Sequence, residues 1–197
     1  MKKVIVAVLL LAVAGLVAWK FFGGKKEGKP EEKQKPVPLG KNTGPFNQSF
    51  ADLLTSYYAL KNALVASDSV KAATTGKELQ TAVEQLKVNE IQGDTLMKET
   101  ARTYMGTIGT AAQVLTTSKT LDDQRRQFET IAGELWTLTR TVQYSGEKIY
   151  WQFCPMAFDN KGAYWMSNDT TIRNPYFGQK MLTCGSTEDS LDYSKKQ

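Results

Sequence analysis

The sequence has 197 residues and contains no histidine. Imidazole is the general base of Ser-His-Asp and Cys-His sites and a ligand in most catalytic zinc sites. A c-type haem attachment motif also requires histidine after its second cysteine. The absence therefore closes the commonest routes to catalysis, and we expect a protein that is not an enzyme.

Acidic residues are scarce in the first part of the chain. Residues 1–45 hold nine lysines and three glutamates, a net charge of +6. The whole chain has a net charge of +5, so the residues after 45 have a net charge of −1. A pI near 9.1 would suggest nucleic-acid binding if the positive charge lay on a folded domain. Because it lies outside the expected domain, we expect no nucleic-acid partner.

The N-terminus has the pattern of an export signal. Lys2 and Lys3 precede an uncharged apolar run over residues 4–19, and Ala12 and Ala14 provide the small residues that signal peptidase recognises. The run is slightly short for a span of about 20 residues. Residues 1–22 are therefore either a cleaved signal peptide or a membrane anchor. Both predict a protein that is periplasmic, secreted or anchored to the inner membrane.

Residues 23–45 are rich in proline, glycine, lysine and glutamate, which favours a flexible linker. Apolar residues at helical spacing then predict four helices, over residues 47–67, 68–87, 94–115 and 120–142. Helix-starting side chains occur at Asp68 or Ser69, Asp94 and Thr120. We therefore expect a four-helix bundle over 46–145 and a C-terminal segment over 146–197 that belongs to the same domain.

The C-terminal segment differs sharply in composition from the helices. Nine of the 20 aromatic residues lie between Tyr144 and Phe177. Two short strands are predicted over residues 149–153 and 163–166, with turns over 159–162 and 174–178. The predicted fold class is all-α, an antiparallel up-down four-helix bundle. An irregular aromatic-rich C-terminal segment containing short strands and turns would pack on it.

Two groups of soft sulfur donors occur in this segment, Cys154-Pro155-Met156 and Met181-Leu182-Thr183-Cys184. Thiolate and thioether ligands select Cu(I) or another soft ion such as Ag(I) over hard cations. The pattern therefore predicts a metal site formed by Cys154, Met156, Met181 and Cys184.

A disulfide is the alternative interpretation of the same residues. Cys154 and Cys184 are the two cysteines of the chain, and an oxidising compartment favours their pairing. A disulfide that closes a loop of about 30 residues stabilises a fold by roughly 3–4 kcal/mol in the chain-entropy model. The methionines would then fill space between the segment and the bundle. A metal site and a disulfide are also compatible as redox alternatives of one site.

The C-terminal segment resembles a bacterial family known as a domain of unknown function. The resemblance rests on Tyr150-x-x-Phe153-Cys154-Pro155-Met156-Ala157, on Gly162-Ala163-Tyr164-Trp165-x-Ser167, and on Ile172-x-Asn174-Pro175-Tyr176-Phe177-Gly178-x-x-Met181-Leu182-x-Cys184-Gly185. It extends loosely to the first helix through Tyr57-Tyr58-x-Leu60-Lys61-x-Ala63-Leu64. Members of that family occur alone behind an export signal or appended to periplasmic adaptor proteins of copper and silver efflux systems.

The resemblance implies Cys154, Met156, Met181 and Cys184 as metal ligands and a heavy-metal efflux adaptor or membrane transporter as the partner. The leading functional prediction is a periplasmic module that binds Cu(I) or Ag(I) in metal efflux or homeostasis. The alternative prediction is a disulfide-stabilised periplasmic domain that binds a protein partner and no metal.

Overall fold

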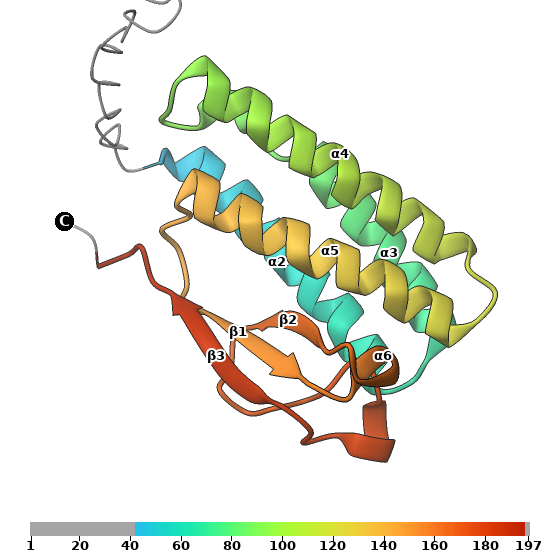
Figure 1. The fold of residues 1–197 in the computed structure, drawn as a ribbon. Coiled ribbons are helices and arrows are strands. Elements are labelled where there is room, and N and C mark those ends of the chain that lie inside the picture. The colour runs from blue at the N-terminus through green and yellow to red at the C-terminus, as the bar shows by residue number, and fades with distance from the viewer. Residues whose placement is uncertain (1–41, 196–197) are drawn as a thin grey trace, which may run out of the picture. The chain divides into compact units, whose positions relative to one another are not determined.

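The computed structural model describes residues 42–195, so the predicted signal or anchor over 1–22 and most of the predicted linker lie outside the described residues. The described elements are four long helices followed by a small sheet (Figure 1). The helices are α2 (Gly44–Val65), α3 (Ser69–Glu84), α4 (Thr95–Thr117) and α5 (Leu121–Val142). No helix in this part of the chain is both long and apolar enough to cross a membrane.

The predicted helix starts are confirmed by side-chain caps. Asp68 accepts the N–H of Lys71, and Asp94 accepts the N–H of Met97, both at 2.8 Å. Thr120 accepts the N–H of Asp123, as a capping residue does. These bonds satisfy donors that the first turn of a helix otherwise leaves without a partner.

The first helix begins earlier than its apolar stripe predicted. It starts at Gly44, and Thr43 caps it by accepting the N–H of Phe46. Pro45 lies in the first turn, where the missing N–H of proline costs no helical hydrogen bond. The second helix ends at Glu84, and the short 3₁₀ helix η1 (Val88–Glu90) follows it.

The predicted all-α fold class is wrong, because the C-terminal segment forms a three-stranded antiparallel sheet of order β2-β1-β3. The strands are β1 (Ile149–Cys154), β2 (Ala163–Ser167) and β3 (Ser186–Leu191). The first two were predicted as short strands, and the third was missed. β3 has the sequence STEDSL and five exposed residues, so no alternation of apolar and polar residues marks it. It is a strand because its main chain pairs with β1.

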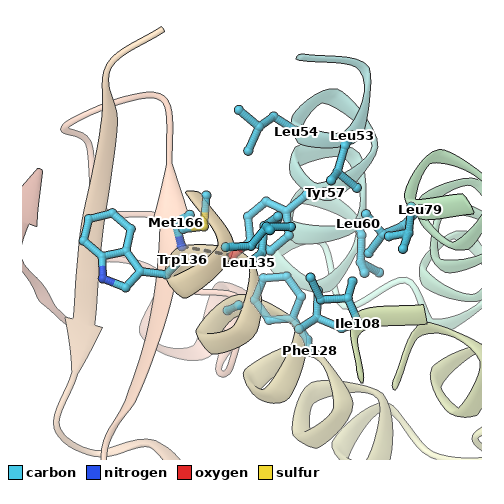
Figure 2. Packing of buried hydrophobic residues seen from close by; sticks show 14 of the residues in the cluster. Leu53, Leu54, Tyr57, Leu60, Leu79, Ile108, Phe128, Leu135, Trp136 and Met166 are labelled. Carbon is cyan, nitrogen blue, oxygen red and sulfur yellow. Dashed lines mark hydrogen bonds between the residues drawn. The ribbon is translucent and has the colours of Figure 1, made fainter. Parts of the chain in front are cut away.

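The four-helix bundle itself is present, and the sheet packs against its α2 and α5 side (Figure 1). The Trp136 ring of α5 stacks on Trp151 of β1, with centroids 4.8 Å apart. The Tyr57 hydroxyl of α2 accepts the Met166 N–H of β2 at 3.0 Å, and Figure 2 shows this bond within the buried apolar cluster. Bundle and sheet therefore share one hydrophobic core.

Lys61 is a second link between α2 and β2. Its side chain is 4 % exposed, and its Nζ donates to Ser167 Oγ at 3.2 Å. Burial lowers the pKa of Lys61 to about 8, with a smaller contribution from the charge of Arg173. A charged lysine at neutral pH therefore has an unfavourable environment in the folded state.

Replacing Tyr57 by phenylalanine should lower the free energy of unfolding by about 1–3 kcal/mol. The substitution leaves the buried Met166 N–H without its acceptor. Urea unfolding measures the change. Tyr104→Phe is the matched control, because Tyr104 is partly buried on α4 and its hydroxyl has no hydrogen bond within the described residues. Equal stabilities of the two variants would contradict the role given to the Tyr57 hydroxyl.

Lys61→Met should raise the free energy of unfolding at pH 7 by roughly 2–3 kcal/mol, because it removes the buried charge. Ser167 Oγ keeps a partner, since it also accepts the Asp169 N–H. As the pH rises from about 8 towards 10.5, folded Lys61 loses its proton before unfolded Lys61 does. The wild type therefore gains stability over that range and the difference between the variants narrows. Urea unfolding at several pH values, with Lys71→Met on the exposed face of α3 as control, checks this; a difference that stays constant with pH would refute it.

Candidate functional site

Cys154 is the last residue of β1 and is fully buried. It pairs with Ala163 of β2, which fixes its backbone position. Side chains alternate between the two faces of a strand, so Cys154 lies on the same face as Gln152, which is also fully buried. The first predicted ligand therefore lies in the rigid part of the sheet.

Cys184 reaches Cys154 from the loop that precedes β3. Their sulfur atoms lie 2.8 Å apart, although 30 residues separate them in the sequence. Cys184 is partly exposed, and its N–H donates to the Met181 carbonyl at 3.1 Å, just after the short helix η2 (Gly178–Met181). The structure thus brings the two predicted cysteines into direct contact.

Asn174 holds the loop that carries Cys184, a role that the sequence-based analysis did not assign to it. Its side chain is fully buried and donates to the Cys184 carbonyl at 2.9 Å. Its Oδ1 accepts the N–H groups of Tyr176 and Phe177, at 2.8 and 3.3 Å. The turn predicted over 174–178 was the available signal, but it did not show that the asparagine side chain ties the turn to Cys184.

Two glycines allow the close approaches that form the site. At Gly185, with φ of +139°, a Cβ atom would lie 2.6 Å from the Phe153 carbonyl oxygen. At Gly178, with φ of +57°, a Cβ atom would lie 2.8 Å from the Val65 carbonyl oxygen at the end of α2. Both contacts involve rigid backbone, so a larger residue would displace the loop.

Arg125 of α5 fastens the same loop to the bundle. It is 9 % exposed, and its Nε donates to the Pro175 carbonyl at 2.9 Å. A second nitrogen donates to Ser67 Oγ at 3.1 Å, and the Asp122 carboxylate lies 3.5 Å from the third. This role was not predicted from the sequence, because a single arginine on an amphipathic helix ordinarily points to solvent.

The environment of Cys184 keeps its thiol protonated at neutral pH. Burial and the contact with Cys154 raise the pKa of Cys184 to about 11, and a hydrogen bond from the Met156 backbone opposes this. A protonated thiol is a poor nucleophile. Both a metal ion and an oxidant therefore have to displace or remove this proton before a bond to the sulfur forms.

The two predicted methionine ligands contact Cys184 through their backbones. The Met156 side chain is 45 % exposed and lines a cavity of about 340 Å³, together with Phe158, Tyr176 and Arg126. Met181 is partly buried. Among residues 42–195 no group of three or more cysteine or carboxylate side chains gathers at one point. Within the described residues the two thiols thus have no third thiol or carboxylate beside them, and the thioethers of Met156 and Met181 are the further predicted ligands.

The turn after Met156 has an unusual backbone. Phe158, Asp159 and Asn160 have consecutive φ values of 51°, 58° and 64°, the left-handed region that residues with a Cβ rarely adopt. The element α6 (Ala157–Asn160) is thus a left-handed turn in the position where a turn was predicted. Phe158 packs edge-on against Tyr176, with centroids 5.3 Å apart, and the Arg126 guanidinium lies 5.1 Å from its ring. These contacts compensate part of the strain.

Asn174→Ala should lower the free energy of unfolding by roughly 2–4 kcal/mol, because it removes the partners of three main-chain groups in a buried loop. In the reduced protein it should also speed alkylation of Cys184, since the loop is released. Thermal unfolding and an iodoacetamide rate measure the two effects. Asn168→Ala, at an exposed position, is the control. Unchanged alkylation with lowered stability would show that Asn174 does not position Cys184.

Comparisons with known proteins match the helical part of the chain. Residues 53–146 match the family model described as "Protein of unknown function (DUF3347)". No curated protein and no solved structure matches the chain. The matched range ends before β1, so the Cys–Met motif and the association with efflux adaptors stay predictions. The match begins within α2 and includes α3, α4 and α5, so this helical part of the chain is similar to a family of unknown function.

Proposed function

We propose that this protein is a periplasmic module that binds Cu(I) or Ag(I) at Cys154 and Cys184, with Met156 and Met181 as thioether ligands. The observation that carries the proposal is the contact between the two cysteine sulfurs, which lie 2.8 Å apart. Cys154 lies at the end of β1, and the buried Asn174 side chain holds the loop that carries Cys184. Thiolate and thioether sulfurs together select soft monovalent ions such as Cu(I) and Ag(I).

Accessibility of the pair supports the proposal. Cys184 is partly exposed, and Met156 is exposed. An ion can therefore reach the sulfurs without unfolding of the sheet. The apolar surroundings of Cys154 favour a compact ion of low charge over a hydrated divalent one. The apolar run and lysines at the N-terminus support export, and a tether would keep the module near an efflux adaptor or transporter.

Metal binding requires a small rearrangement of the pair. At a metal–sulfur distance of about 2.3 Å, two ligands of one tetrahedral ion lie roughly 3.8 Å apart. The sulfurs therefore have to separate by about 1 Å when an ion enters. Cys184 lies in a loop and Cys154 in the sheet, so the loop is the part that moves.

The second candidate is a disulfide-stabilised domain that binds a protein partner, and the same short distance favours it. Sulfurs at 2.8 Å are closer than two ligands of one ion. Formation of the bond removes two protons and two electrons from the thiols, and the thiol oxidants of an exporting compartment supply the acceptor. The disulfide would fix the start of β3 against the end of β1.

A Cu(I) titration of the full chain separates the candidates. Protein purified from the periplasm is assayed for free thiols, reduced anaerobically and titrated with Cu(I) against a competing chelator. We expect one ion bound per chain, at least 100-fold weaker binding for Cys154→Ser and Cys184→Ser, and about 10-fold weaker binding for Met156→Leu and Met181→Leu. Met105→Leu on α4 is the control and should bind as the wild type does.

The outcomes distinguish the two functions. Copper binding by the reduced wild type that both serine variants lose would support the metal module. Reduced wild type that binds no more Cu(I) than the double serine variant would refute it. Absence of free thiols in that case would support the disulfide-stabilised domain.

A further inference from the structure

The two edges of the sheet are treated differently by the rest of the molecule. At the β2 edge, the Met166 N–H is bonded to the Tyr57 hydroxyl, and the Tyr164 carbonyl accepts the Tyr176 hydroxyl. Helix α2 and the C-terminal loop thus occupy main-chain groups that β2 does not use in pairing with β1. This edge is closed to another strand.

The β3 edge is not covered by any other described element. β3 pairs only with β1 in the sheet, and Figure 1 shows it at the outer margin, away from the helices. Five of its six residues are exposed. An uncovered edge strand presents unpaired main-chain donors and acceptors to an added strand.

The side chains of β3 specify the charge of the strand that it can accept. Glu188 and Asp189 are adjacent in the sequence, Glu188 being the extra residue between the pairs Trp151–Asp189 and Gln152–Thr187, and no basic residue occurs within the strand. The Asp189 carboxylate accepts the N–H of Ser190 at 2.7 Å and so occupies an edge donor. When a main-chain carbonyl of an added strand accepts the Ser190 N–H, the Asp189 carboxylate loses this hydrogen bond. A lysine or arginine of the added strand can then form an ion pair with the Asp189 carboxylate.

The β3 strand of a second copy does not meet that requirement. Antiparallel pairing of β3 with another β3 places carboxylates directly opposite or diagonal to one another, where like charges destabilise the pairing. We propose that the β3 edge is a docking site for an extended, lysine- or arginine-bearing segment of a partner protein, which adds to the sheet as a fourth strand. The observations behind this inference do not include metal binding by the sulfur pair.

The test uses the full chain and a short synthetic peptide in which lysine alternates with valine or threonine, with binding followed by calorimetry. Two further peptides separate the contributions: one carries glutamate in place of lysine, and one is methylated on each central backbone nitrogen. The methylated peptide keeps its charge and loses its main-chain donors. We expect the parent peptide to bind and both altered peptides to bind at least tenfold more weakly.

Matched variants locate the site on β3. Ser190→Pro removes an N–H that is bonded to the Asp189 carboxylate, and proline is tolerated at such positions of an edge strand. Ser190→Ala keeps the backbone intact. Ser190→Pro should bind the peptide at least tenfold more weakly than Ser190→Ala, with the same circular dichroism. Glu188→Gln with Asp189→Asn should weaken binding about three- to tenfold and reduce its salt dependence.

Three binding results would overturn the inference, and so would one result on the oligomeric state. The binding results are absence of binding by the wild type, equal binding of the methylated and parent peptides, and equal affinities of Ser190→Pro and Ser190→Ala. Concentration-dependent dimerisation that Ser190→Pro abolishes would show that a second copy occupies the edge, and would overturn it as well.

Discussion

The position of the sheet on the bundle depends on the side chain of Tyr57. The ring is fully buried in α2 and stacks on Phe128 of α5, with centroids 5.2 Å apart, while its hydroxyl accepts the Met166 N–H of β2 (Figure 2). Burial raises the pKa of Tyr57 above its ordinary range, so the hydroxyl stays neutral. One side chain therefore joins two helices and a strand, and it fixes the β-sheet from which Cys154 is presented.

The sequence predicted those elements whose causes are local. Helices α3, α4 and α5 begin where Asp68, Asp94 and Thr120 supply caps, and these signals lie within a few residues of the helices that they start. Strands β1 and β2 are rich in aromatic residues and were predicted for that reason. β3 could not be predicted in this way, because its polar sequence gains its strand conformation from pairing with β1. That pairing also has an irregularity beside Trp151, which no local pattern encodes.

The candidate site likewise contains residues that were predicted from the sequence and residues that were not. The two cysteines and two methionines were predicted from their chemistry and spacing, and the structure brings the cysteines into contact. Asn174 and Arg125, which hold the intervening loop, were not predicted. Asn174 donates to the Cys184 carbonyl, and Arg125 donates to the Pro175 carbonyl. Both carbonyls are distant in the sequence from the side chains that bind them. Residue type alone does not reveal a tertiary role of this kind.

The location of Cys184 gives the sulfur pair a mechanical consequence. Cys184 lies two residues before β3, and β3 buries almost no apolar surface of its own. Its attachment therefore depends on main-chain hydrogen bonds to β1 and on whatever joins Cys184 to Cys154. β2, in contrast, is held by Tyr57, Tyr176 and the shared core. A bond through a metal ion or between the sulfurs would restrict the unfolded loop and so stabilise β3 more than any other strand. The chemical state of the sulfur pair and the order of the uncovered sheet edge are thus coupled through a single short connection.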